Sequence, residues 1–377
     1  MKKERLLSPG PTPVPPEVLL ELAQPVIHHR TARNRAVLRE TTEGLKRVFM
    51  TGNDPLILAC SGTGAMEAAI TNTVSAGEKA ICIVGGKFGQ RWREICSAFG
   101  VEVVDVEVKW GEAVDPAAVA AALNQHPDAV AVCATLCETS TAVVHDIRAL
   151  GEITRRTPAL LIVDGVSGLG AVELWMDDWG VDVVVAGSQK ALMLPPGLGL
   201  AALSDKAWAK VEKTRRTCYY FDLLKARQSL ASDDTPWTPA HTLILGLRRA
   251  LGMIEAAGGV EAMWQGASLL AGATRKAVQS MGLALLSKAP ANALTAVVMP
   301  QGVDAEQVRK RMSQRDGITV AAGQEALKGK IVRIAHMGFI DRFDVIAALL
   351  ALAKALSDLG HPVQTAGIAQ AFADVEV

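Results

Sequence analysis

A lysine and an aspartate each stand at the end of an apolar segment of this chain. Lys190 closely follows the apolar run 181–186, and Asp164 closes the apolar run 160–163. A lysine amine can form a Schiff base with an aldehyde, and an aspartate can keep a pyridine nitrogen protonated so that the ring accepts electrons. The pair therefore predicts pyridoxal phosphate (PLP) chemistry, with Lys190 and Asp164 as its catalytic residues.

The residues that follow the lysine indicate that it is not an ordinary surface residue. A lone lysine after a strand is usually solvated, and a lone aspartate there is usually a turn residue. The segment 191–199 (ALMLPPGLG) is apolar and rich in turn-forming residues, which places Lys190 away from an open polar face. Desolvation of this kind lowers the pKa of a lysine and favours the neutral amine.

A glycine-rich turn after the run 55–60 is typical of a phosphate site. Residues 61–65 (SGTGA) open a helical pattern, so that Thr63, Gly64 and Ala65 lie at a helix N-terminus with free N–H groups. Gln189 could add a donor to the same phosphate. The turn has neither the GxGxxG spacing nor a Walker lysine, which favours a monophosphate, although tight packing alone can also explain such glycines.

Two further strand ends carry groups that suit a flat cofactor. Phe88 follows the run 79–84 and could stack on a heterocycle, or simply fill the core. Thr139 and Ser140 follow the run 129–135 and could bond the cofactor ring or the substrate, or cap the helix expected after Asp146.

One arginine lies inside an apolar strand pattern. Arg333 is surrounded by the sequence IVRIAHMG, where an unpaired cation is costly to bury. A structural ion pair would satisfy it. The alternative is a bidentate clamp for the carboxylate of a substrate.

The elements that must position these residues alternate between strands and helices. Apolar, β-branched runs occur at 55–60, 79–84, 101–108, 129–135, 159–164, 181–187 and 199–204, and helical periodicity occurs at 65–74, 90–99, 116–124 and 147–156. This alternation predicts an α/β fold with a mostly parallel seven-stranded sheet covered on both faces. Ligands of such sheets bind at the carboxyl ends of the strands, where Asp164 and Lys190 are expected.

The chain divides into three expected parts. Residues 1–15 are proline-rich and form an extended arm. Residues 16–257 form the large domain and end with a long helix over 240–257. Residues 258–377 form a smaller α+β domain, with helices expected at 261–281, 305–314 and 342–359 and strands at 293–299 and 331–336.

Composition excludes several classes of partner. The chain carries 39 Lys and Arg against 39 Asp and Glu, so a net charge of zero argues against nucleic acid. We expect no signal peptide and no membrane segment, and hence a cytoplasmic protein. The six cysteines include no CxxC pair and are interpreted as buried small hydrophobes, so no metal is predicted.

Taken together, these motifs resemble the class V aminotransferases, PLP enzymes of fold type I. The nearest group is the alanine–glyoxylate and serine–glyoxylate (serine–pyruvate) aminotransferases. The order and spacing of the motifs carry the resemblance, which covers most of the chain: SPGP at 8–11, SGTG at 61–64, GKFGQR at 86–91, ETST at 138–141, VDGVSGLG at 163–170, GSQKAL at 187–192 and VRI at 332–334.

The resemblance implies an enzyme that moves an amino group from a small L-amino acid, alanine or serine, to a 2-oxo acid such as glyoxylate or pyruvate. By similarity, Lys190 would carry the cofactor and Arg333 the substrate carboxylate, while Pro9 and Gly10 would line the substrate pocket. The family forms homodimers with shared active sites, in which Thr242 of the partner would contact the phosphate. The region 215–237 matches only loosely, which leaves the substrate open.

Other functions stay open at this stage. A related transaminase acting on 2-aminoethylphosphonate, ureidoglycine or aspartate has the same motifs. A cysteine desulfurase would need a cysteine in the later loops, but the last one is Cys218. A non-catalytic partner protein could keep the fold, but it would need neither Lys190 nor Asp164. A NAD-dependent oxidoreductase lacks support because the GxGxxG motif is missing.

Overall fold

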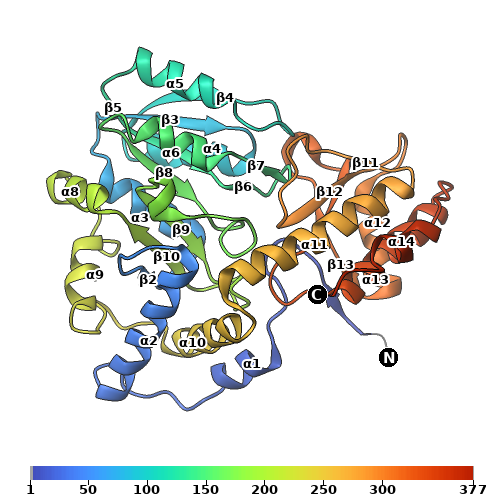
Figure 1. Cartoon of the computed structure of the whole chain (residues 1–377), viewed down its shortest axis with the longest axis horizontal. Helices are drawn as coiled ribbons and strands as arrows, with labels where there is room; N and C mark the ends of the chain where they lie inside the picture. Colours follow the sequence, from blue (N-terminus) through green and yellow to red (C-terminus); the bar gives the residue numbers. More distant parts are fainter. Residues whose placement is uncertain (1–2, 377) are drawn as a thin grey trace.

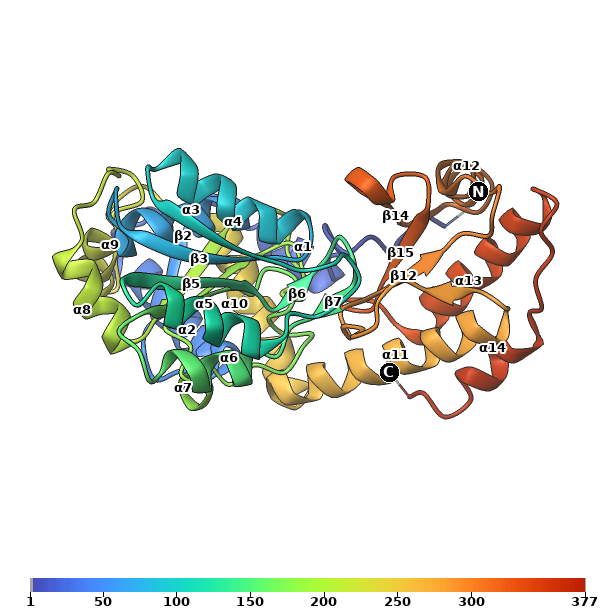
Figure 2. The same cartoon turned by 90° about the horizontal axis from the view of Figure 1, so that it is seen from above.

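The computed structural model describes residues 3–376, which fold around two sheets (Figures 1 and 2). The larger sheet has the strand order β2-β10-β9-β8-β5-β3-β4. Its strands are β2 (Leu56–Leu58), β3 (Lys79–Val84), β4 (Glu102–Glu107), β5 (Ala129–Thr135), β8 (Leu160–Asp164), β9 (Val183–Gly187) and β10 (Gly199–Leu203). Six strands run parallel, whereas β10 is antiparallel to both β2 and β9. The predicted seven-stranded sheet is therefore confirmed, because each apolar run became one of its strands.

Helices cover both faces of this sheet, because successive side chains of a strand point to opposite faces. Ile81 and Ile83 of β3 join the core beneath α2 (Ala32–Phe49), α5 (Pro116–Gln125), α6 (Ile147–Thr154) and α10 (His241–Ala256). Ala80 and Cys82 face the other core, beneath α3 (Gly62–Thr73), α4 (Lys87–Ala98) and α8 (Asp205–Lys213). The four helical patterns noted between the runs correspond to α3, α4, α5 and α6.

The smaller sheet is antiparallel and lies in the C-terminal part of the chain. Its order is β11-β12-β15-β14, and the N-terminal strand β1 pairs in parallel with β13 nearby. The strands are β1 (Arg5–Leu6), β11 (Ala284–Leu285), β12 (Leu294–Val298), β13 (Ile318–Thr319), β14 (Ala321–Ala322) and β15 (Ile331–Ala335). They pack with α12 (Ala305–Arg311), which continues as a π-helix to Asp316, and with α13 (Arg342–Ser357) and α14 (Ala366–Ala371).

One long helix connects the two cores. Helix α11 (Gly259–Ser280) buries Val260, Trp264 and Ala267 against the large core, and Leu270 and Ala277 against the small one. Figure 2 shows it bridging the two bodies. The domain division at residue 258 stays a prediction.

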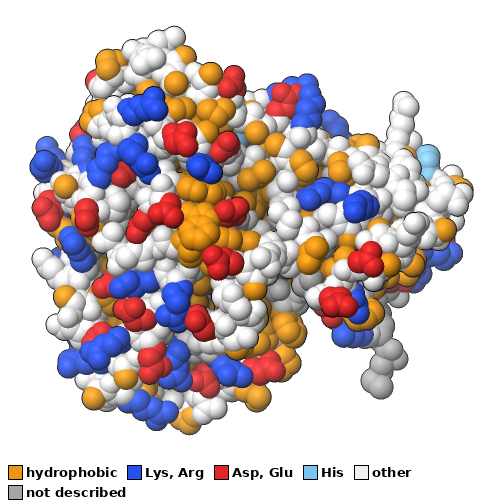
Figure 3. Space-filling view, in the orientation of Figure 1, with side chains coloured by type: hydrophobic (Ala, Val, Ile, Leu, Met, Phe, Trp, Pro, Cys, Tyr) orange, Lys and Arg blue, Asp and Glu red, His pale blue; other side chains and the backbone are white. Residues whose placement is uncertain are grey.

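The remaining elements are short. They are α1 (Pro16–Leu22), α7 (Met176–Trp179), α9 (Leu223–Leu230), a 3-10 turn (Glu325–Leu327), and the paired strands β6 (Cys137–Glu138) and β7 (Val143–Val144). Basic and acidic side chains are interspersed over the face in Figure 3, in keeping with the balanced charge. Among residues 3–376, no helix has both the length and the apolar character needed to cross a membrane.

Candidate active site

Asp164 and Lys190 lie at the carboxyl edge of the large sheet, as the sequence predicts. Asp164 is the last residue of β8, in register with Thr135 of β5 and Val185 of β9, and Lys190 follows the end of β9. Asp164 is 3% exposed and Lys190 8% exposed. The fold thus brings both groups to one edge and removes both from water.

Burial changes the proton affinity of both groups. It lowers the pKa of Lys190 to about 8 and raises the pKa of Asp164 to about 6. One hydrogen bond, donated by the N–H of Val166 at 2.8 Å, works in the opposite direction on Asp164. Burial therefore raises the fraction of the neutral amine, which is the form that attacks an aldehyde.

The proline-rich arm covers the lysine. Lys190 Nζ donates a hydrogen bond to the carbonyl oxygen of Pro9. Gly10 has φ +131°, and a Cβ added there would overlap Lys190 Cε and Nζ. Pro9 and Gly10, expected near the substrate, lie directly against the predicted catalytic amine.

The N-terminus of α3 forms a cradle beside these residues. The first N–H groups of a helix have no partner within it, and Ser61 provides no side-chain cap. A Cβ on Gly62 would lie 2.6 Å from Val166 Cγ2, and one on Gly64 2.7 Å from Cys60 Cβ, so both positions require glycine. Ala65 is fully buried and its N–H bonds to Ser61 O at 3.1 Å, so this amide is engaged within the helix.

Two side chains add polar groups to the cradle. Gln189 Oε1 is buried and has no hydrogen-bond partner among the described residues. A Cβ on Gly187 would lie 2.9 Å from this oxygen and 3.5 Å from the N of Gly62, so the amide group lies near the start of α3. Thr63 Oγ1 accepts a hydrogen bond from Arg91 Nη1 at 3.2 Å. Sequence reasoning assigned no role to Arg91, although it quoted the motif that contains it.

A buried carboxylate organises the next part of the site. Glu138 is 1% exposed and accepts hydrogen bonds from the N–H groups of Phe88 (3.0 Å), Gly89 (2.9 Å) and Ser140 (3.0 Å). It thereby fixes the first turn of α4, which carries Phe88 with the Arg91 guanidinium 4.7 Å from its ring centroid. Sequence reasoning missed Glu138, because a glutamate in a motif of hydroxyl residues gives no sign of which helix it will contact.

The two hydroxyl residues have separate partners. Thr139 Oγ1 donates to Ser167 Oγ at 2.5 Å, and Ser140 Oγ accepts from the N–H of Lys87 at 3.1 Å. Neither residue caps helix α6. The N-cap of α6 is Asp146, whose side chain accepts a hydrogen bond from the N–H of Ala149.

Arg333 lies on β15 and faces the large domain. It is 6% exposed, and it donates from Nε to Ala322 O at 2.8 Å and from Nη1 to Thr139 O at 2.7 Å. Burial lowers its pKa to about 10. No carboxylate among the described residues forms an ion pair with Arg333. The structure therefore does not support the alternative of a structural ion pair. A buried guanidinium with only carbonyl partners is suited to an added anion.

Thr242 is the one predicted site residue placed at the start of α10. It is partly buried, and its side chain makes no hydrogen bond with the described residues. Its predicted role belongs to a partner subunit.

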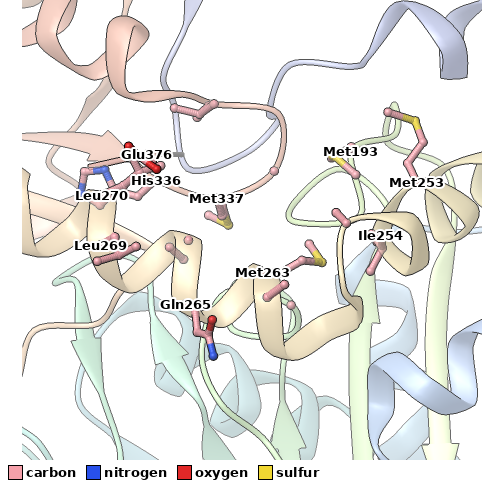
Figure 4. Close-up of a pocket in the computed structure, with 17 residues that line it drawn as sticks. Met193, Met253, Ile254, Met263, Gln265, Leu269, Leu270, His336, Met337 and Glu376 are labelled. Atoms are coloured by element: carbon pink, nitrogen blue, oxygen red, sulfur yellow. The ribbon is translucent and has the colours of Figure 1, made fainter. Parts of the chain in front are cut away.

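A separate apolar pocket of about 530 Å³ lies between α10, α11 and the chain after β15 (Figure 4). Four methionines contribute to its lining: Met193, Met253, Met263 and Met337. None of the predicted site residues lines it.

Three cysteines meet in the core on the α4 side of the large sheet. The sulfur atoms of Cys82, Cys96 and Cys133 lie within 4.8 Å of one another, and all three residues are buried. Their spacing in the sequence gave no sign of this. They pack among apolar side chains of that core. The prediction that all six cysteines are buried is wrong for Cys60 and Cys218, which are only partly buried.

The groups at the sheet edge fit PLP. The α3 N-terminus suits a phosphate, to which the NH2 group of the nearby Gln189 amide can donate. Asp164 suits a pyridine nitrogen, and the desolvated Lys190 suits an aldehyde. Fold and site together define a PLP-dependent transaminase. The chain belongs to the Aminotransferase class-V family, whose sequence profile matches residues 5–342.

Curated relatives and solved structures agree with this family. The chain is 42% identical over 376 residues to the "Soluble hydrogenase, small subunit" of Synechococcus sp., covering 98% of this chain and 97% of that protein. It is 36% identical to the L-aspartate–glyoxylate aminotransferase of Paracoccus denitrificans, covering 96% and 94%.

Two solved structures have nearly the same fold. One is pyridoxamine–pyruvate aminotransferase from Mesorhizobium loti, with a TM-score of 0.94 and 28% identity, covering 99% of this chain and 97% of that one. The other is alanine–glyoxylate aminotransferase from Nostoc sp., with a TM-score of 0.91 and 29% identity, covering 94% and 96%.

Proposed function

We propose that this transaminase moves the amino group of a small L-amino acid, alanine or serine, to a 2-oxo acid such as glyoxylate or pyruvate. The observation that carries the proposal is the buried pair Lys190 and Asp164 with Arg333 close enough to act electrostatically on Lys190. Among the described residues, Arg333 has only carbonyl oxygens as hydrogen-bond partners. Glyoxylate or pyruvate also appears in the names of three of the four relatives described above.

Each residue has a defined task in this reaction. Bound PLP supplies an aldehyde that accepts the amino group and a ring that accepts an electron pair. Arg333 binds the substrate carboxylate, which places the α-hydrogen before Lys190. Lys190 Nζ then removes the α-proton and returns it on the cofactor side. Asp164 holds a proton at the pyridine nitrogen, and Pro9 and Gly10 keep water away from the amine.

Gly10 packs directly against the end of the Lys190 side chain, so the arm lies next to the amine where the substrate must bind. L-Aspartate is the rival donor, because the Paracoccus relative is named for it. Its second carboxylate needs a further cation, and Arg91 beside Thr63 is a candidate.

We further propose a cytoplasmic homodimer with shared active sites, in which Thr242 contacts the phosphate held by the other subunit. The hydroxyl of Thr242 has no hydrogen-bond partner within residues 3–376, which supports this. So do the exposed apolar residues Leu19 (50% exposed) and Leu20 (68% exposed) on α1, a helix packed on α10.

Borohydride reduction followed by mass spectrometry tests the lysine. We expect the cofactor on the peptide that contains Lys190, and no covalent cofactor in Lys190→Ala, which should also lose turnover. Lys206→Ala, which removes another partly buried amine on α8, is the matched control. Substantial transamination by Lys190→Ala would contradict the assignment.

A donor panel then tests the substrate. L-Alanine, L-serine, L-aspartate and 2-aminoethylphosphonate are each supplied with glyoxylate, and glycine formation is measured. Turnover with alanine or serine at the highest kcat/KM is the expected result, and a clear preference for aspartate would replace the proposed donor.

A further inference from the structure

The N-terminal arm is attached at its start to the strand that carries Arg333. Strand β1 pairs with β13 of the small domain, and the N–H of Leu7 donates to Thr319 O at 2.8 Å. The carbonyl of Leu7 then accepts from the N–H of Ala335 at 2.9 Å. Ala335 is two residues beyond Arg333 on β15, so a displacement of that strand moves Leu7 with it.

The other end of the arm is attached to the lysine loop. Thr12 is 2% exposed, its N–H donates to Gln189 O at 3.1 Å, and its Oγ1 donates to Lys190 O at 2.7 Å. Between the two attachments, the Pro9 carbonyl accepts from Lys190 Nζ. The side chain of Ser8 donates to Pro11 O at 2.7 Å and fixes the shape of this loop.

The chain leaving β15 contacts the same point. Gly338 has φ +76°, and a Cβ there would lie 3.1 Å from Thr12 Oγ1 and 3.2 Å from Lys190 O. Thr12 is therefore enclosed between the lysine loop and the continuation of the strand that carries Arg333. The small domain and the catalytic amine are linked through one short buried segment.

We propose that Thr12 is a positioning residue that holds the arm 7–12 against the lysine loop, so that a carboxylate bound at Arg333 sets the position of the Lys190 amine. The link depends on the proposed role of Arg333, whereas the attachment of the arm by Thr12 does not. An anion that draws β15 toward the large domain carries Leu7, and with it the Pro9 carbonyl that holds the amine.

The attachment is tested on the cofactor-free full chain by labelling Lys190 with trinitrobenzenesulfonate, followed by peptide mass spectrometry. In Thr12→Val the arm should open more often and the labelling rate of Lys190 should rise about 3–10-fold, as expected for one lost buried hydrogen bond. Thr12→Ser should restore the slow rate. Thr154→Val removes a comparable buried hydroxyl–carbonyl bond on α6 and should change nothing at Lys190. Equal rates in all four proteins would overturn the proposal.

The link itself is tested with propionate, a carboxylate without an amino group. In the native protein, bound propionate should slow the labelling of Lys190. In Thr12→Val it should still bind, as measured by calorimetry, but protect Lys190 less. Equal protection in both would mean that propionate merely blocks the amine, which overturns the link.

Two readouts separate this proposal from the function on which it rests. If propionate binds to Arg333→Ala as tightly as to the native protein, Arg333 does not bind the substrate carboxylate. The labelling result for Thr12→Val would still show whether Thr12 holds the arm against the lysine loop. In the PLP-loaded enzyme, Thr12→Val should lower kcat with little change in the KM for the amino donor, and Thr12→Ser should restore it. A change confined to KM would contradict a positioning role.

Discussion

Asp164 makes the cofactor-free protein less stable at neutral pH. Its carboxyl has a pKa of about 6 in the folded chain, because burial disfavours the charge, against an ordinary value of 3.8. The folded state therefore binds the proton more tightly than the unfolded state. The contribution of Asp164 to stability is most favourable below the pKa that its carboxyl has in the unfolded chain. This contribution is lost as the pH rises from about 4 to about 6.

Asp164→Asn should remove this cost. Above about pH 6 the cofactor-free variant should be more stable than the native chain by about 3 kcal/mol, and near pH 4 by little. Urea unfolding at both pH values measures the difference. With PLP bound, the variant should turn over about 100-fold more slowly, since the group aimed at the pyridine nitrogen is gone. If Asp164→Asn is no more stable than the native chain at pH 7.5, other groups must offset the cost of burying the charged carboxylate.

At the scale of single residues, sequence reasoning located the groups that follow strands and missed those that act across the fold. Asp164 and Lys190 were recognisable because an apolar run ends beside each of them. Glu138 and Thr12 act through backbone groups distant in sequence, and the hydroxyl of Thr12 meets a carbonyl 178 positions away. Nothing local to either residue specifies such a partner.

Helix α4 depends on a side chain that does not belong to it. Its N-cap, Gly86, has no side chain to accept hydrogen bonds from the free N–H groups of the first turn. Glu138, which lies on β6, accepts two of these hydrogen bonds. A Cβ on Gly86 would overlap the Glu138 carboxylate, so glycine at this position leaves room for the carboxylate. The helix start and the hairpin β6–β7 are thus fixed together.

Glu138→Ala should destabilise the protein by about 3–5 kcal/mol, because it leaves several buried N–H groups without an acceptor. Glu138→Gln keeps one acceptor oxygen and should cost less. Glu94→Gln, an exposed position on the same helix, is the control and should stay within about 0.5 kcal/mol. Denaturant unfolding compares the three, and a loss of less than about 1 kcal/mol in Glu138→Ala would contradict the structural role.

At the scale of elements, the sequence identified the strands and helices that are long enough to show a clear apolar pattern. All seven strands of the large sheet were visible as apolar runs. Most of them are buried on both faces, whereas the edge strand β4 exposes Glu102, Asp105 and Glu107 and was recognisable from its valines. The two-residue strands β1 and β13 were not, since their pairing is set by tertiary contacts. Helix α2 was also missed, although Thr31 caps it by accepting from the N–H of Asn34 and the buried residues Val37, Leu45 and Val48 recur at helical spacing. A local signal for this helix was therefore present in the sequence.

At the scale of the whole molecule, the predicted contact of Thr242 with the phosphate requires a second subunit. If active sites are shared, a dimer that combines a Lys190→Ala subunit with a Thr242→Ala subunit contains one site with both residues intact. Mixing and refolding the two variants should therefore yield more activity than either variant alone. If Thr242 acts within its own chain, the hybrid gains nothing. Sedimentation of the mixture verifies that dimers form.

The pairing of β1 with β13 has a consequence for the order in which the protein is made. Arg5 and Leu6 leave the ribosome long before their partners Ile318 and Thr319. Contacts so distant in sequence are among the slowest to form. A nascent chain that has already folded the large sheet therefore holds the arm over Lys190 only at its Thr12 end, and the second attachment forms after Ile318 and Thr319 have emerged.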